Sequence, residues 1–186
     1  MDLQLIFVVE ANSKCKSDWF YIKDTIDRFY VYDQAHVRLT PVYMDGKGKY
    51  QKKEREISSL IKQYTNASKN NATRKSVVIY CFDCDNYDTK YEDRIFLDTA
   101  KKYCDSHGYE FVWFYEDIEC VYLGRRVDKG QKKKEAESFR CRKGIENITI
   151  KKLLNVAYKA NSSNLMVVLD KYLINHSMKG KMDSHT

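Results

Sequence analysis

Carboxylates follow two apolar runs of this sequence. An apolar stretch in the middle of the chain stops at Asp83 and Asp85, with Asp88 close behind, and the apolar N-terminal stretch stops at Glu10. Carboxylates that converge repel each other unless a cation or a proton lies between them, and hard oxygen ligands favour Mg²⁺, Mn²⁺ or Ca²⁺. A divalent ion there would polarise a phosphoryl oxygen or activate a water molecule. Glu10 would complete the ligand shell or move a proton.

A plain turn is the competing interpretation of the acidic stretch. Asp and Asn are favoured in turns after strands, and the spacing of Asp83 and Asp85 taken alone indicates no more than that. On an extended chain these two side chains would point to the same side, with Cys84 opposite. The acid at the end of the first apolar run favours the metal interpretation, while Asp88 stays open as a ligand or a turn residue.

Strands that alternate with helices are expected to position these acids. Apolar or β-branched runs predict strands at 3–10, 36–44, 76–82 and 109–115. Helical spacing of apolar residues predicts helices at 17–30, 53–67, 91–108, 116–124 (a helix or a turn), 147–160 and 163–177, the last with a first half that also suits a strand. This order predicts an α/β fold with a mostly parallel sheet of about four strands, flanked by helices and followed by a C-terminal helical extension. Ligands of such sheets bind beyond the carboxyl ends of the strands, where Glu10 and the acidic pair stand.

Local signals refine these elements. Ser17 suits a helix N-cap, and Asp18 would follow it in the first turn. Pro41 cannot donate to a strand ladder, so its strand is expected at an edge of the sheet. Gly108 suits a helix end. A polar turn is expected at 68–75 and a frayed end at 178–186.

The length of 186 residues suits one compact domain. We expect an α/β part over 1–124, with the basic segment and C-terminal helices over 125–186 packed on the same domain. No apolar run approaches the roughly 18–20 residues that cross a bilayer, and the N-terminus lacks the basic start of a signal peptide. These features predict a cytoplasmic protein without a membrane partner.

Positive charge is concentrated in two segments. The chain has a net charge of +7, and its excess gathers at 46–55 and 124–144. Such density suits a nucleic-acid partner, although a solvated loop is the competing interpretation. Arg125 and Arg126 could hold a phosphate, whereas 132–134 lacks a glycine-rich or helix-start setting and suggests diffuse electrostatics. The candidate nucleic-acid contacts are Lys47, Lys49, Lys52, Lys53, Arg125, Arg126, Lys132, Lys133 and Lys134.

The six cysteines predict ordinary reduced thiols. Cys81 and Cys84 form a CxxC, but a zinc site needs a second pair of ligands and a redox pair stands at a helix start. The four histidines stand in no recognisable nucleophile setting, so a catalytic triad is not predicted.

An apolar strand that ends in Glu, followed by a helix and later by an apolar strand that ends in DxD, resembles the Toprim domain. The resemblance covers about residues 3–124 and is greatest to small RloB-like proteins, related to the OLD nucleases. It implies that Glu10 is a general acid/base or metal ligand and that Asp83 and Asp85 bind the metal. In RloB-like proteins a later strand is followed by a short element that contains Glu. In this sequence, either Ile118-Glu119 or Tyr115-Glu116 stands in that place. The usual glycine after the glutamate is Ala11 here, and the next acid, Asp18, follows a longer loop.

Three functions follow as hypotheses. The first is a Mg²⁺- or Mn²⁺-dependent Toprim-type nuclease, or another enzyme acting on phosphodiesters of nucleic acid, which the resemblance places in bacterial defence against phage. The second is a non-catalytic nucleic-acid-binding or sensor module that needs a partner protein or a homo-oligomer, motivated by Ala11 and the longer loop. The third is a phosphotransferase or phosphatase that uses DxD, although Tyr87 stands where haloacid-dehalogenase-like phosphatases carry Thr or Val.

Overall fold

A computed structural model of the chain describes residues 2–67 and 73–176. The elements, with η for 3₁₀ helices, are β1 (Asp2–Val9), α1 (Ser17–Phe29), β2 (Tyr30–Val31), β3 (Val37–Tyr43), η1 (Lys47–Lys53), α2 (Glu54–Asn66), β4 (Arg74–Asp83), α3 (Tyr91–His107), β5 (Glu110–Phe114), α4 (Ile118–Leu123), α5 (Lys132–Cys141), η2 (Gly144–Asn147), α6 (Ile150–Leu153), α7 (Leu165–Leu169) and β6 (Ile174–Asn175). Residues 68–72 of the predicted polar turn and the predicted frayed end lie outside the described residues.

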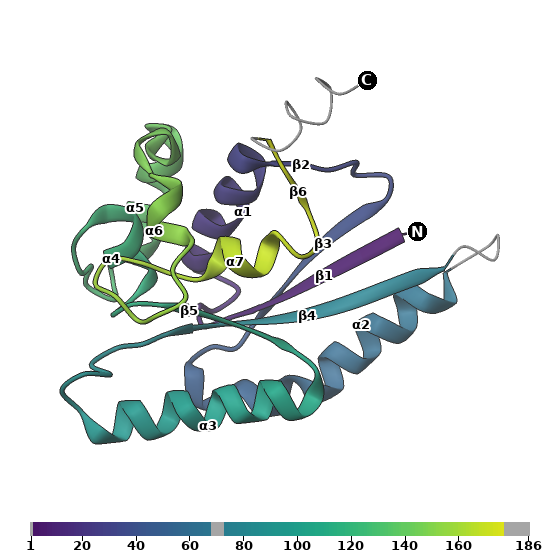
Figure 1. Cartoon of the computed structure of the whole chain (residues 1–186), viewed down its shortest axis with the longest axis horizontal. Coiled ribbons are helices and arrows are strands. Elements are labelled where there is room, and N and C mark those ends of the chain that lie inside the picture. Colours follow the sequence, from purple (N-terminus) through teal and green to yellow (C-terminus); the bar gives the residue numbers. More distant parts are fainter. Residues whose placement is uncertain (1, 68–72, 177–186) are drawn as a thin grey trace.

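Four parallel strands form the central sheet, in the order β3-β1-β4-β5 (Figure 1). This arrangement, with helices on both sides, confirms the α/β fold. The strand with Pro41 lies at an edge, as its missing N–H requires. The two innermost strands, β1 and β4, are the ones that lead into Glu10 and Asp83.

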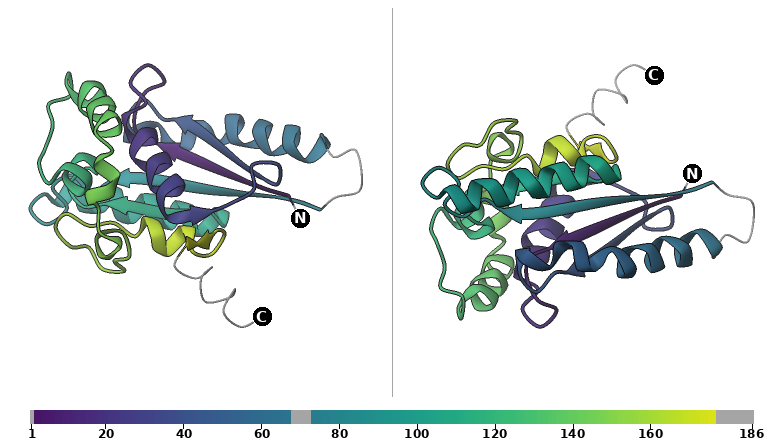
Figure 2. Two further views of the ribbon diagram at one scale, coloured as in Figure 1. Left: turned by 90° about the horizontal axis from the view of Figure 1, so that it is seen from above. Right: turned by 90° about the horizontal axis from the view of Figure 1, so that it is seen from below.

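Two helical layers cover the sheet (Figure 2). On one face, α1, α4, α5 and α7 pack against Leu5 and Phe7 of β1; on the other, α2 and α3 cover Ile6 and Val8. Successive strand residues point to opposite faces, so a strand covered on both sides must be apolar throughout. This explains the unbroken apolar run before Glu10.

The C-terminal part differs from the predicted pair of long helices. Only the short α6 and α7 form within 147–169, and β6 pairs antiparallel with β2. The side chain of Asn164 accepts a hydrogen bond from the backbone N–H of Trp113 (2.8 Å) and donates one to the carbonyl of Phe111 (2.9 Å). These bonds satisfy the open edge of β5 and hold residues around Ser163 in an extended bridge to Phe114. The prediction of continuous helices was wrong because tertiary hydrogen bonds at the sheet edge outweigh helical spacing.

The second basic segment contains a helix that sequence patterns did not predict. α5 packs against α1, with Phe139 in ring contact with Tyr21 (centroids 5.0 Å apart) and Tyr122 (5.8 Å). Gly144 lies directly on Phe139, where an added Cβ would come within 2.4 Å of a ring carbon. Residues beyond 124 therefore share the core of the α/β part.

Candidate functional site

Glu10 and Asp83 meet at the carboxyl ends of the two central strands. The backbone N–H of Asp83 donates to Oε1 of Glu10 at 2.9 Å. In the sheet, β3 lies on one side of β1, and β4 and β5 lie on the other. The direction in which successive strands are added therefore reverses between β1 and β4, and Glu10 and Asp83 flank this point. Open α/β sheets bind ligands at such a point. The expectation that Glu10 and Asp83 meet at one edge of the sheet is confirmed.

Asp85 takes a different direction from the one expected. β4 ends at Asp83, Cys84 turns into the core, and Asp85 has a left-handed backbone (φ 50°). Its carboxylate pairs with Lys47, which also contacts Asp93 at 3.1 Å. The extended geometry predicted for Asp83 and Asp85 was wrong, because the strand stops one residue before Cys84. Asp85 nevertheless lines the same cleft as Glu10 and Asp83.

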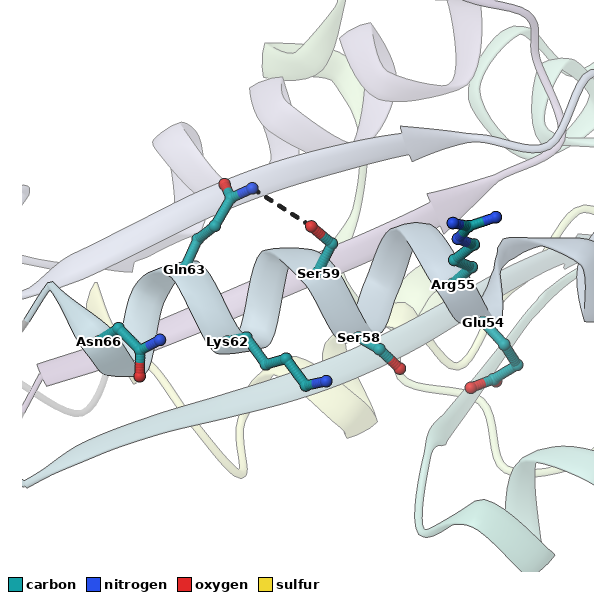
Figure 3. A pocket seen from close by; sticks show the side chains of 7 residues that line it. All are labelled: Glu54, Arg55, Ser58, Ser59, Lys62, Gln63 and Asn66. Carbon is teal, nitrogen blue, oxygen red and sulfur yellow. Dashed lines mark hydrogen bonds between the residues drawn. The ribbon is translucent and has the colours of Figure 1, made fainter.

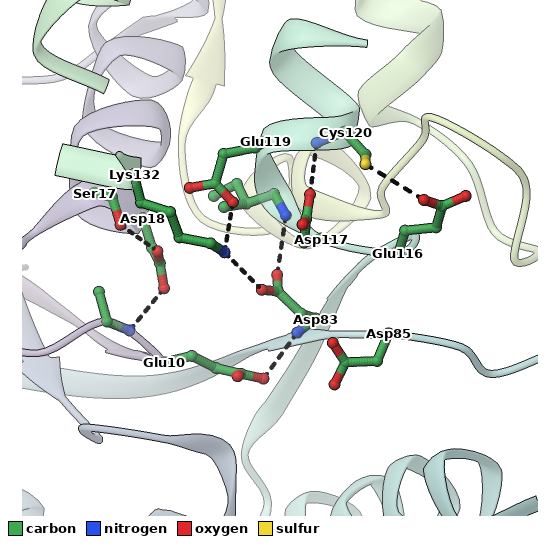
Figure 4. Close-up of polar contacts among 12 residues, drawn as sticks. Glu10, Ser17, Asp18, Asp83, Asp85, Glu116, Asp117, Glu119, Cys120 and Lys132 are labelled. Carbon is green, nitrogen blue, oxygen red and sulfur yellow. Dashed lines mark hydrogen bonds and ion pairs between the residues drawn. The ribbon is translucent and has the colours of Figure 1, made fainter. Parts of the chain in front are cut away.

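The loop after Glu10 returns to the site through Asp18. Oδ2 of Asp18 accepts the backbone N–H of Ala11 at 2.8 Å, and Oδ1 accepts the hydroxyl of Ser17 at 2.9 Å (Figure 4). Ala11 is not among the residues with positive φ, so this turn does not need glycine. The expected N-cap was wrong: Lys16 takes that position in a left-handed conformation, and Ser17 is the first helical residue. Asp18 is thus a site residue, signalled in the sequence only as the first acid after Glu10.

Lys132 enters the acidic site from the start of α5. Its Nζ lies 2.7 Å from Oε2 of Glu119 and 3.9 Å from Oδ2 of Asp83 (Figure 4). The other oxygen of Asp83 accepts the backbone N–H of Ile118 at 3.0 Å. The diffuse electrostatic role predicted for residue 132 was wrong, because α5 carries this one lysine into the cleft. Of the two alternatives for the motif after β5, Glu119 is the acid that reaches the site.

Glu116 and Asp117 contribute differently. Asp117 caps α4 by accepting the backbone N–H of Cys120 at 2.7 Å, and it also lines the cleft. Glu116 pairs with Arg126 at 2.9 Å, and Arg126 also donates to Asn86 at 3.1 Å. Arg126 is thereby held at the rim of the cleft, where a guanidinium can meet an anion.

Burial and crowding shape the electrostatics of the site. Burial, together with the charges of Asp18 and Asp85, raises the pKa of Glu10 to about 8. Burial and the charge of Glu10 raise the pKa of Asp83 well above its usual range. Burial raises the pKa of Glu119 to about 7, against the opposing charge of Lys132. A bound cation would lower these pKa values, because it offsets the repulsion between neighbouring carboxylates.

The cleft has a volume of about 770 Å³ and an acidic lining, with seven carboxylate residues against three cationic ones. This excess of negative charge favours a bound cation at the strand ends. The three basic side chains of the lining all come from the second basic segment. The charged lining residues are Glu10, Asp18, Asp45, Asp83, Asp85, Asp117, Asp128, Arg126, Lys129 and Lys132. Sequence patterns had not singled out Asp45, Asp117, Asp128 or Lys129.

The donor set suits a hard divalent cation, although the side chains are not arranged around one. Within the part of the chain that the structure describes, no three His, Cys, Asp or Glu residues are close enough together to hold a metal ion as they stand. Oε2 of Glu10 has no hydrogen bond there, and Oδ2 of Asp83 has only the distant Lys132. Oxygen donors with spare capacity are what Mg²⁺ and Mn²⁺ require. Glu10, Asp83 and Asp85 therefore fit such an ion if the Asp85 side chain rotates away from Lys47.

The remaining predicted residues lie around the cleft or apart from it. Asp88 is exposed and accepts a hydrogen bond from Tyr115, outside the lining residues. Most of the basic candidates are exposed, and several are paired locally. The ion pairs are Lys49–Asp45, Lys53–Glu56, Arg125–Glu135 and Lys133–Glu137. Lys52 and Lys134 are exposed.

A second hollow, on α2, has no comparable chemistry. It is lined by one face of that helix, from Glu54 to Asn66, and Gln63 donates to Ser59, one turn earlier, at 3.2 Å (Figure 3). No strand end contributes to it. The cleft at the ends of β1 and β4 is therefore the candidate functional site.

All six cysteines are free, and Cys81, Cys84, Cys104 and Cys120 are buried, as reduced packing thiols should be. Burial raises the pKa of Cys81 well above its usual range, so it is not an activated nucleophile. No helix in the described residues is both long and apolar enough to span a membrane.

Comparison with known proteins does not assign this chain to a family. No family model matches the sequence, and neither a curated protein nor a solved structure matches it. The functional interpretation therefore rests on the residues of the cleft.

Proposed function

We propose that this protein is a divalent-metal-dependent enzyme that hydrolyses phosphodiester bonds of nucleic acid. The observation that carries the proposal is the contact between Glu10 and the backbone of Asp83 at the carboxyl ends of adjacent parallel strands. A third carboxylate, Asp85, lines the same cleft. The resemblance of the glutamate and DxD motifs to Toprim domains supports the same chemistry, as does the basic charge beside the cleft.

Each residue has a distinct task in this proposal. Asp83 and Asp85 would hold Mg²⁺ or Mn²⁺, which when bound polarises a phosphoryl oxygen and acidifies a bound water. Once a bound cation offsets the raised pKa of Glu10, its unengaged Oε2 would accept the proton of the attacking water. Arg126 at the rim would bind the phosphate backbone, and exposed lysines of the two basic segments would track the strand.

A nuclease assay tests this proposal directly. The full chain is incubated with labelled single- and double-stranded RNA and DNA, with and without Mn²⁺ or Mg²⁺. We expect cleavage only with the ion, and a loss of at least 100-fold in Asp83→Asn and Glu10→Gln. Asp98→Asn, an exposed acid on α3, is the matched control and should retain activity. Cleavage that persists in Asp83→Asn at the wild-type rate would refute the proposal.

A second candidate function is a non-catalytic module that binds nucleic-acid phosphate. One observation favours it: Lys132 lies near Asp83, and Lys47 pairs with Asp85, as expected where cations of the chain replace a metal. The same substrates distinguish the two functions. Saturable binding that needs no divalent ion, without turnover of any substrate, would favour the module.

A further inference from the structure

Lys132 occupies an unusual place for a lysine. It is the first residue of α5, followed by Lys133 and Lys134, although the positive end of the helix dipole disfavours cations there. Its two neighbours point outward and are exposed, whereas Lys132 turns into the acidic cleft. The acids of the cleft must therefore compensate for the unfavourable position of this one charge.

Glu119 holds the ammonium in place. Glu119 is fully buried, at 0% exposure, and its Oε2 lies 2.7 Å from Nζ of Lys132. Its Oε1 has no hydrogen-bond partner among the described residues. Within the same described part of the chain, Oε2 likewise has no hydrogen bond and only the ion pair with Lys132, so this buried carboxylate depends on a cation and keeps the capacity for another ligand.

The ammonium lies where the inner acids of the site converge. On one side it faces Glu119, and on the other it faces Oδ2 of Asp83, 3.9 Å away. On its other side, the backbone N–H of Asp83 faces Glu10 (Figure 4), and both residues line the cleft. Asp83 thus stands between a side occupied by the ammonium of Lys132 and the side of Glu10 and Asp85, where the only paired cation among the described residues is the partly exposed Lys47.

From this arrangement we propose that Lys132 is a tethered cation in the position of a second divalent ion, so that the site binds a single Mn²⁺ or Mg²⁺. This inference rests on the proposed metal-dependent function and specifies it. The single ion belongs on the side of Glu10, Asp83 and Asp85. On the side of Glu119, Lys132 of α5 supplies the positive charge. An ammonium has three N–H donors, and here one oxygen of Glu119 and one of Asp83 face it, so a third donor can face an oxygen of the substrate phosphate.

The stoichiometry of Mn²⁺ binding tests this inference without measuring turnover. Free Mn²⁺ is followed by electron paramagnetic resonance as the full chain is titrated. We expect one ion per wild-type chain and one per chain in Lys132→Arg. In Lys132→Met, Glu119 and Asp83 lose their cation, so a second ion should bind at least 10-fold more tightly than any second ion in the wild type.

Two matched measurements complete the design. Lys133→Met removes the neighbouring charge, which is exposed, and should leave one ion bound. Because Lys132→Met without metal leaves Glu119 uncompensated, its melting temperature should rise more on Mn²⁺ addition than that of the wild type. If this variant does not fold at all, the wild-type stoichiometry still tests the single-ion claim, which two ions of similar affinity would overturn.

The outcomes separate this inference from the proposed function. Two ions of similar affinity in the wild type, or one ion in both wild type and folded Lys132→Met, would overturn the inference alone. No Mn²⁺ binding by the wild type would overturn both.

Discussion

Two lysines pair with the acids of the DxD motif, and they do so in contrasting surroundings. Lys132 reaches Asp83 and the fully buried Glu119, and we call this the inner contact. Lys47 reaches Asp85 and Asp93, and we call this the outer contact. The side chain of Asp83 is 12% exposed, against 40% for Asp85.

The difference in burial gives the two contacts different consequences. Removing one partner of a buried pair leaves an uncompensated charge, whereas an exposed pair contributes little and exchanges readily with water and ions. The inner contact is therefore a fixed part of the fold. The outer contact is one that a divalent ion can displace. Four substitutions test this contrast, from the largest expected effect to the smallest.

Lys132→Met should have the largest effect on stability. We expect the free energy of unfolding to fall by about 3 kcal/mol, because Glu119 is left buried without its cation. Urea unfolding without divalent ions measures it. The double variant Lys132→Met/Glu119→Met replaces the pair with apolar side chains and should recover most of the loss. A single variant as stable as the wild type would show that the inner contact is not a fixed part of the fold.

Glu10→Gln should change how stability depends on pH. The pKa of Glu10 is raised from its usual 4.5 to about 8 in the folded protein, mainly by burial. Between those values the folded state binds more protons than the unfolded state, so this residue makes stability fall as pH rises from about 5 to 8. Glutamine keeps an acceptor for the Asp83 N–H but carries no proton to lose, so the variant should show a flatter profile.

Denaturant unfolding at several pH values, without divalent ions, checks this expectation. Some slope should remain in Glu10→Gln, because burial and crowding also raise the pKa of Asp83. Asp98→Asn is the control and should run parallel to the wild type. Parallel profiles for Glu10→Gln and the wild type would contradict the assignment of the raised pKa to Glu10.

Gly144→Ala tests whether α5 holds the inner contact in position. The new methyl group would meet a ring carbon of Phe139 at 2.4 Å, so the ring must move. Overpacking of this kind costs roughly 1–3 kcal/mol. Gly130→Ala is the matched control, since nothing lies within 4 Å of its added Cβ. Equal thermal stability of both variants would indicate that α5 tolerates repacking.

Lys47→Met should have the smallest effect on stability, below about 1 kcal/mol, because the outer contact is partly exposed. Part of the lysine's packing on Phe96, whose ring centroid is 4.8 Å from Nζ, is kept by methionine. Its informative readout is Mn²⁺ affinity, which should rise several-fold once Asp85 is released. Lys49→Met loses only an exposed pair with Asp45, so the stability and the Mn²⁺ affinity should both stay unchanged. Reduced Mn²⁺ affinity in Lys47→Met would contradict the view that Lys47 competes with the ion for Asp85.

The sequence by itself determined the sheet and the meeting of Glu10 with Asp83. Strands covered on both faces must be continuously apolar, and parallel strands bring their carboxyl ends to one edge. Both facts depend on local pattern and chain order, so they can be predicted without coordinates. The edge position of the Pro41 strand and the end of α3 at Gly108 followed for similarly local reasons.

Only the tertiary structure decided which other charges join the site. Lys132, Glu119 and Asp83 are far apart in the sequence, and nothing in the local pattern distinguishes Lys132 from Lys133. The packing of Phe139 against α1 sets the direction of α5, and this packing selects the one lysine that enters the cleft. Asn164 likewise determines the course of the C-terminal segment through bonds to the edge of β5. Such contacts join distant segments, and their energies depend on burial that exists only once the chain has folded.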